Sequence, residues 1–194
     1  MRNLKLLLAA LAMLAAPLAA MPAAAQPQEI EAPEGPWSPD GVDAVFPDEI
    51  GDYRRVSINS YGAANWSVGY NLWDGDVLVH SITVYLLTPR GTCQSEMSGS
   101  KTALERLNSG AMQLTDGTAA APSGRPGAAL HARYRLPNGF GSMTQAVLSD
   151  VYLFCPTGSR FWIKARSTWS EERSALEGGT AEVLHGIKWP AETK

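Results

Sequence analysis

The sequence is poor in the residues that hold metals and carry out nucleophilic catalysis. Its 194 residues include only two cysteines and three histidines. No CxxC or HxxxH spacing occurs, so we expect no zinc site. Neither a G-x-S-x-G motif nor a glycine-rich phosphate-binding motif is present. These absences remove the common metalloenzymes, nucleotide-binding folds and α/β-hydrolases, and we expect no metal and no cofactor.

Long apolar runs are also absent beyond residue 25, so we expect no membrane-spanning helix there. The start of the chain differs. Arg2 and Lys5 precede an apolar run over residues 6–18, and small residues follow at 23–25. This pattern predicts a secretory signal peptide over residues 1–25, cut after the last of these alanines. A membrane anchor is the alternative, but two prolines interrupt the run. The sequence therefore predicts a periplasmic or secreted protein.

Strong charge is absent as well. The formal net charge is −3, and losing Arg2 and Lys5 with the signal peptide changes it to −5. Mild acidity and export both argue against a nucleic-acid partner. In an oxidising compartment the two cysteines, Cys93 and Cys155, are expected to form one disulfide. The alternative is two buried free thiols.

The remaining sequence divides into three segments. Residues 26–45 are rich in proline and acid, which predicts a mobile arm, with Trp37 as the one side chain able to dock. Residues 46–190 predict a single domain, and residues 191–194 a short tail.

Within the domain, alternating apolar residues and two clear turn signals, Asp74-Gly75 and Asn138-Gly139, predict antiparallel strands. A helix over 95–108 is capped by Ser95, residues 117–127 form a loop, and a last helix after Ser170 is divided by Gly178-Gly179 into two short helices. The expected class is α+β: one twisted antiparallel sheet of about six strands in βββα-βββα order, with helices packed against it. The expected strands cover residues 53–59, 66–73, 77–87, 128–136, 142–154 and 161–169.

Two stretches carry a resemblance. Residues 46–55, Phe-Pro-Asp-Glu-Ile-Gly-Asp-Tyr-Arg-Arg, resemble an opening seen in exported bacterial proteins of unknown function, and the strand around Ile82–Tyr85 fits the same group. The strand order, above all over residues 128–189, resembles the Mog1/PsbP-like fold. That resemblance implies an accessory or binding role and brings no catalytic residues with it.

Catalytic candidates are few. Ser98 and Lys101 match the S-x-x-K motif of penicillin-binding proteins, but the S-D-N and K-T-G motifs that accompany it are missing, which favours a plain helix surface. His80 is expected in the core, His131 in solvent and His185 in the last helix. Asp150 is the one strand acid of interest, and a hairpin-edge position is its alternative.

The charge distribution is more informative, because the basic residues concentrate in the second half of the chain. Strand alternation places them in two groups with one aromatic residue, and neighbouring strands would join the groups into one basic patch. An ordinary solvated face, a docking site for an anionic partner, and a surface covered by the acidic arm are the three interpretations. The candidate residues are Arg133, Arg135, Arg160, Trp162, Lys164 and Arg166.

Six tryptophans are many for this length, and most are expected as core or rim anchors. A sugar-binding platform is the alternative and requires exposed rings. The sequence as a whole predicts a non-catalytic periplasmic binding or accessory protein, with an unknown protein or an anionic envelope component as partner. A small envelope hydrolase and a structural envelope component are the alternatives.

Overall fold

A computed structural model describes residues 27–62, 64–121 and 127–189, and its main feature is a single antiparallel sheet. The predicted signal peptide and the C-terminal tail lie outside these residues. The strands are β1 (Gln28–Ile30), β2 (Glu49–Ile50), β3 (Tyr53–Ser60), β4 (Trp66–Asp74), β5 (Val77–Leu87), β6 (Met112–Ala120), β7 (Ala128–Leu136), β8 (Val147–Phe154) and β9 (Trp162–Ser170). The helices are α1 (Cys93–Leu107), the 3₁₀ turn η1 (Ser174–Gly178) and α2 (Gly179–Gly186).

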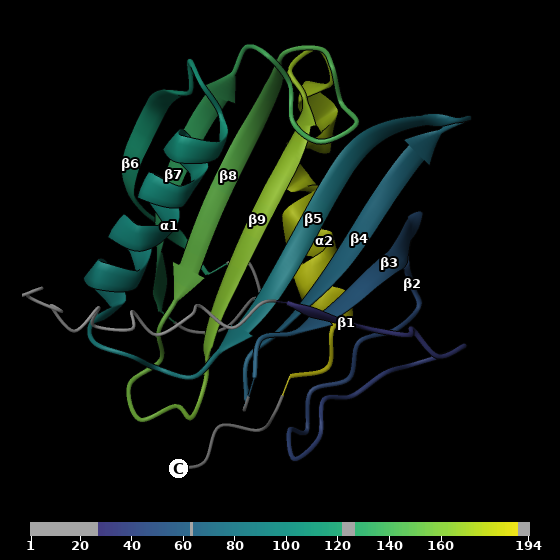
Figure 1. Cartoon of the computed structure of the whole chain (residues 1–194), viewed down its shortest axis with the longest axis vertical. Helices are drawn as coiled ribbons and strands as arrows, with labels where there is room; N and C mark the ends of the chain where they lie inside the picture. Colours follow the sequence, from purple (N-terminus) through teal and green to yellow (C-terminus); the bar gives the residue numbers. More distant parts are fainter. Residues whose placement is uncertain (1–26, 63, 122–126, 190–194) are drawn as a thin grey trace, which may run out of the picture.

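The sheet consists of two meanders joined at their last strands. Its order is β1-β3-β4-β5-β9-β8-β7-β6, with β2 paired to β3 outside this path. The first meander ends at β5, and α1 then carries the chain to β6 at the far edge. The second meander returns strand by strand until β9 pairs with β5. Figure 1 shows this arrangement, with α1 in front of the second meander.

The expected α+β fold of six strands in βββα-βββα order is wrong. The structure is mostly sheet, with nine strands and only short helices among the described residues. The main difference is β6, which follows α1 directly and includes part of the expected 117–127 loop. Its side chains are exposed on both faces, so its sequence lacks the apolar alternation that reveals a half-buried strand. The expected strand over 142–154 begins only at Val147, and residues 137–146 form a long loop.

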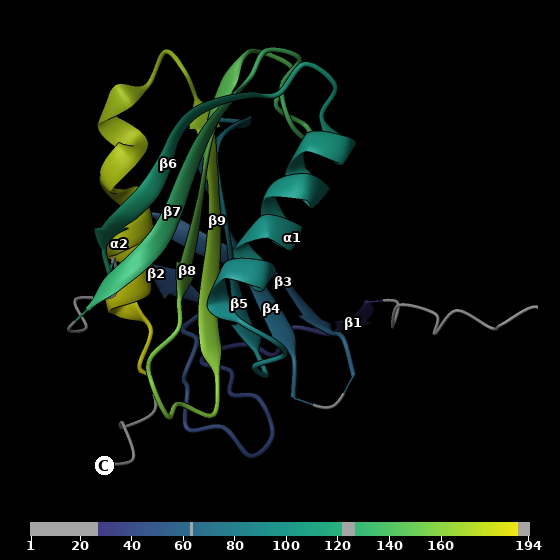
Figure 2. The same cartoon turned by 90° about the vertical axis from the view of Figure 1, so that its left-hand side faces the viewer.

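The helices cover opposite faces of the sheet, as Figure 2 shows, and each face has its own core. Strand residues alternate between the faces because the side-chain period of a strand is two. Met97 and Leu104 of α1 pack over β7 and β8 on one side, the α1 face. Val183 and Leu184 of α2 pack over the central strands on the other side, the α2 face. Among the described helices, none is long and apolar enough to cross a membrane.

The described part of the expected mobile arm, residues 27–45, lies on the domain. It contributes β1 to the sheet edge, and Trp37 forms a bridge with Phe46 and packs on its ring, as the docking alternative for this tryptophan requires. Val42 and Ala44 enter the core of the α2 face. The mobility of the arm in solution stays a prediction.

Specific residues define the start of α1 and the boundary between η1 and α2. The cap of α1 is Thr92 rather than Ser95, and the two side chains form a reciprocal capping box. Cys93 begins this helix and forms the expected disulfide with Cys155, with the two Cα atoms 6.1 Å apart. Near the C-terminus of the chain, the pair Gly178-Gly179 divides η1 from α2, which confirms the expectation of two short helices.

Candidate anion-binding site

The six basic-patch candidates do not form one surface. Strand β8 lies between β7 and β9, so the two groups are not neighbours. Arg133 and Arg135 on β7 point to the α2 face, where Arg133 reaches Glu177 of η1. On β9, Lys164 points to the α1 face and reaches Glu96 of α1. Trp162 lies on that same face, within its core, with 8% of its surface exposed.

Three of the five basic candidates are neutralised by carboxylates. Arg133 forms two hydrogen bonds with Asp150, of 2.7 and 2.8 Å, and a third with Glu177. Arg135 donates to Glu171 at 2.8 Å. The Lys164 ammonium donates to the carboxylate of Glu96 at 3.0 Å. These side chains therefore offer little free positive charge to a partner.

Arg160 and Arg166 are the two candidates that no carboxylate of the described chain approaches within ion-pair distance. Arg160 is exposed at the surface, where it contacts the Gly41 carbonyl at 3.4 Å and packs against Phe161. Arg166 differs because its guanidinium is largely shielded. Its Nη2 is buried and makes no hydrogen bond within the described residues.

Arg166 is held by stacking and by one long polar contact. The ring of Phe140, from the 137–146 loop, lies over its guanidinium, with 3.8 Å between the Cζ atom and the ring centroid. Its Nε lies 3.5 Å from the hydroxyl of Ser149, which is itself hydrogen-bonded to Thr168 at 2.9 Å. Burial lowers the pKa of Arg166, and the neighbouring Tyr85 opposes this shift. The site therefore contains a partly desolvated cation without a counter-ion in the described chain.

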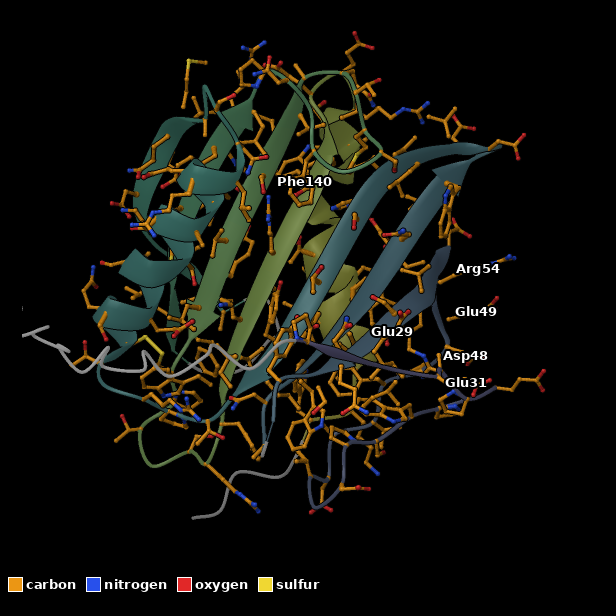
Figure 3. The ribbon with its side chains drawn as sticks, viewed as in Figure 1. Glu29, Glu31, Asp48, Glu49, Arg54 and Phe140 are labelled. Carbon is orange, nitrogen blue, oxygen red and sulfur yellow. A yellow bond between two sulfur atoms is a disulfide. The ribbon has the colours of Figure 1, made fainter. Side chains whose placement is uncertain are left out.

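The surrounding α1 face is polar across the centre of the sheet. Directly opposed residues of antiparallel strands share a face, so the pairing registers define rows of neighbouring side chains. These rows are Asn59, Ser67, Tyr85 and Lys164; Ser57, Gly69, Thr83 and Arg166; and Asn71, Ser81, Thr168 and Ser149. Figure 3 shows Phe140 over this central region, whereas Glu29, Glu31, Asp48 and Glu49 gather at the opposite edge of the sheet. Glu29 and Glu31 of the arm are thus remote from Phe140, which covers Arg166.

The hydroxyls beside Arg166 include two that remain available. Ser81 and Thr83 are half-buried on β5, and neither side chain makes a hydrogen bond within the described residues. Hydroxyls donate and accept, and a guanidinium presents a planar fork of N–H donors. The arrangement can therefore bind a carboxylate or a phosphate group, with the arginine providing charge and the hydroxyls orienting the oxygens.

Asp150 lies on the opposite face, in the sheet interior rather than at a hairpin edge. Its side chain is 1% exposed and contacts Arg133, His131 and the Tyr152 hydroxyl. Burial would raise its pKa, but the hydrogen bonds from Arg133 and the nearby His131 imidazole, whose Nε2 lies 3.2 Å from Oδ1, outweigh burial and hold the pKa below its ordinary value. His131 stacks on Tyr152 instead of facing open solvent. Asp150 is therefore a satisfied structural ion, not a free acid or base.

A serine–histidine pair also lies on the α2 face. His80 Nε2 is 2.6 Å from the Ser167 hydroxyl, and its Nδ1 is 2.8 Å from the Tyr53 hydroxyl. This spacing suits an activated nucleophile, but both residues of the pair are fully buried, and α2 packs on His80 and Tyr53 at Gly179. Burial lowers the pKa of His80 to about 4. The pair joins β5 to β9 as a neutral core network and presents no reactive group to solvent.

The remaining candidates also have structural positions. Lys101 of the S-x-x-K motif forms an ion pair with Asp116 on β6, while Ser98 is exposed on α1. His185 is exposed on α2. Within the described residues, no group of three or more His, Cys, Asp or Glu side chains is arranged to hold a metal ion.

Sequence reasoning missed most of the residues around Arg166. Phe140 lies between the expected turn at Asn138-Gly139 and the expected strand over 142–154, so neither element includes it. Thr83 and Ser81 lie in the expected strand over 77–87, and their alternation with Ile82 and Val84 is a signal for one polar face.

Comparisons of the chain with protein families, curated proteins and solved structures found no relative. No family model matches the chain, and neither the curated proteins nor the solved structures contain a significant match. The Mog1/PsbP-like resemblance accordingly stays a prediction.

Proposed function

We propose that this protein is a non-catalytic binding or accessory protein that takes an anionic group on its α1 face at Arg166. The observation that supports this most strongly is a shielded guanidinium with an unpaired Nη2 and no carboxylate partner in the described chain. A buried polar group left without a partner costs about 1–3 kcal/mol, and more when it is charged. A ligand that supplies the missing acceptor recovers this free energy on binding.

The chemistry of the site favours a carboxylate or phosphate group. Arg166 can pair with such groups at two points, and the unengaged hydroxyl of Thr83 lies in the same cross-strand row while that of Ser81 lies in the neighbouring row. Lys164 adds little charge because it already pairs with Glu96. The site thus carries about one net positive charge, which suits a single anionic group on a protein or an envelope component.

We also propose that the protein works outside the cytoplasm. The disulfide-bonded pair Cys93–Cys155 fits an extracellular location, because such bonds persist in oxidising compartments. The predicted signal peptide over residues 1–25 would bring the chain there. A periplasmic or secreted binding protein combines these two expectations with the cation on the α1 face.

The test is a titration with two small anions, acetate and inorganic phosphate, at constant ionic strength. Binding is followed by the shift of the thermal midpoint and by the Arg Nε–H resonances in ¹H–¹⁵N spectra. We expect a saturable stabilisation of the wild type that Arg166→Gln abolishes. Arg160→Gln is the matched control, because it removes an arginine that also lacks a carboxylate partner but is exposed at the surface.

Two outcomes would overturn the proposal. One is an equal response of the wild type and Arg166→Gln to both anions. The other is a response that Arg160→Gln removes and Arg166→Gln retains, because binding would then take place at the exposed arginine. Comparing acetate with phosphate at equal concentration identifies which group the site prefers.

A further inference from the structure

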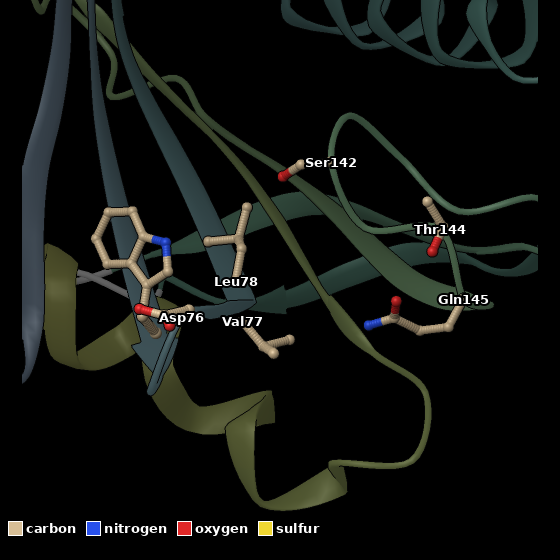
Figure 4. A pocket seen from close by; sticks show the side chains of 7 residues that line it. Asp76, Val77, Leu78, Ser142, Thr144 and Gln145 are labelled. Atoms are coloured by element: carbon tan, nitrogen blue, oxygen red, sulfur yellow. The ribbon is translucent and has the colours of Figure 1, made fainter.

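A cavity lies at the end of the β4–β5 hairpin. It has a volume of about 330 Å³ and lies between the hairpin and the 137–146 loop, as Figure 4 shows. The hairpin side carries Asp76, Val77 and Leu78, and the loop side carries Ser142, Thr144 and Gln145. Trp73 completes the lining. This volume is at the lower end of the range for small-molecule sites, so it suits a single ring.

The apolar part of the cavity is unusually accessible. Trp73 keeps 40% of its surface exposed and Val77 keeps 58%. No other Trp, Tyr or Phe side chain of the described residues is exposed: Trp37, Trp66 and Trp189 are half-buried, and Trp162 and Trp169 are 8% and 0% exposed. An indole ring left open beside a cavity offers a flat apolar surface to a ligand.

The polar part of the cavity is unengaged. Within the described residues, no hydrogen bond involves the side chains of Asp76, Ser142, Thr144 or Gln145. Asp76 differs in this from its neighbour Asp74, which accepts a hydrogen bond from Arg173 at 2.6 Å. One carboxylate, one amide and two hydroxyls therefore line the same space with their donors and acceptors free.

We propose that this cavity binds a neutral pyranose ring of a saccharide. A pyranose has an apolar C–H face that can stack on the Trp73 indole. Its hydroxyls are donors and acceptors at the ring edge, which match the Asp76 carboxylate and the Gln145 amide. Ser142 and Thr144 supply further hydroxyl contacts from the loop.

The charge and the polar groups of the cavity argue against anionic ligands and against quaternary ammonium ligands. Asp76 is the one charged residue in the lining, so a carboxylate or phosphate is repelled. A quaternary ammonium group suits a carboxylate beside an aromatic ring. It makes no use of the three neutral polar side chains, however, because it has no N–H donor. The inference depends on this cavity alone and does not require that Arg166 binds an anion.

The experiment uses the six tryptophan indole N–H resonances of the full-length protein. Trp73→Phe removes one resonance and so identifies it. The wild type is then titrated with methyl β-glucopyranoside and N-acetylglucosamine, and in separate arms with acetate and tetramethylammonium. We expect the two sugars to shift the Trp73 resonance saturably. Asp76→Ala and Gln145→Ala should each weaken the response roughly fivefold or more, as the loss of one hydrogen bond predicts.

Controls separate this site from the rest of the molecule. Trp66→Phe changes a half-buried tryptophan of the same strand that packs on Phe161, and it should leave the sugar response intact. Arg166→Gln should also leave it intact, so the failure of the anion site and of this site are distinguishable. A response of Trp73 to tetramethylammonium alone, a sugar response confined to other tryptophans, or no response to either sugar would each overturn the inference.

Discussion

The ring of Phe140 covers the guanidinium of Arg166, with 3.8 Å between the ring centroid and Cζ. This contact joins the 137–146 loop to β9 across the α1 face. It shields a cation that has no carboxylate partner in the described chain, and it belongs to the loop that lines the cavity at the β4–β5 hairpin. The loop thus covers one face of the Arg166 guanidinium.

Replacing Phe140 with alanine should open the anion site. The stacking contact contributes on the order of 1 kcal/mol, and its loss exposes the guanidinium to solvent. We expect Arg166 to react faster with phenylglyoxal in Phe140→Ala than in the wild type, as measured by mass spectrometry of the modified peptide. The exposed Arg160 provides the internal control, because its rate should not change. Equal rates at Arg166 in both proteins would show that Phe140 does not restrict access.

Replacing Arg166 with methionine should stabilise the protein while abolishing anion binding. Methionine keeps the apolar stem and removes a charge whose desolvation is not compensated by a partner. We expect the free energy of unfolding in urea to rise by about 1 kcal/mol. Lys164→Met is the matched control and should lower stability, since it leaves Glu96 without its ion pair. A loss of stability in Arg166→Met as large as in Lys164→Met would assign Arg166 a structural role.

Local signals in the sequence located most strands correctly. Each of the six expected segments contains a strand, from β3 to β5 and from β7 to β9, because alternation and turn residues act over a few positions. The two cysteines likewise allow only one disulfide within the chain. What local patterns could not supply was β6, whose side chains are exposed on both faces, and the pairing of β5 with β9 across the two meanders.

The candidate site was harder to predict for the same reason. Arg166 stood among six candidates, and its difference from the others depends on which carboxylates reach them. Arg135 finds Glu171 at a separation of 36 residues, and Lys164 finds Glu96 at 68. No local pattern reports these pairings. Only the folded chain distinguishes a neutralised arginine from one that remains available to a ligand.

The buried His80 should make stability depend on pH between about 6.5 and 4. Burial lowers its pKa from 6.5 to about 4, slightly opposed by the Asp150 carboxylate. Below pH 6.5 the unfolded chain binds a proton that the native state does not, so stability falls as the pH falls through this window. The loss amounts to at most about 3 kcal/mol. Urea unfolding at a series of pH values measures it.

Two variants identify His80 as the source of this slope. His80→Gln should be less stable at pH 7, because it disturbs the contacts with Tyr53 and Ser167, but its stability should change less over the same pH interval. The exposed His185, changed to glutamine, should keep the wild-type slope. Asp150, whose pKa lies below its ordinary value of 3.8, acts at lower pH. An unchanged slope in His80→Gln would assign the pH dependence to other groups.

The glycine pair between η1 and α2 offers a matched test of how closely α2 packs on the sheet. A methyl group on Gly179 would overlap the Tyr53 hydroxyl and lie 3.0 Å from His80 Cε1, whereas one on Gly178 meets no atom within 4 Å. Gly179→Ala should therefore destabilise the protein by about 1–3 kcal/mol. Gly178→Ala should be neutral or slightly stabilising, because alanine restricts the unfolded chain. Removing the hydroxyl in Gly179→Ala/Tyr53→Phe should recover part of the loss, and equal stability of the two single alanine variants would contradict the close packing of α2 on Tyr53.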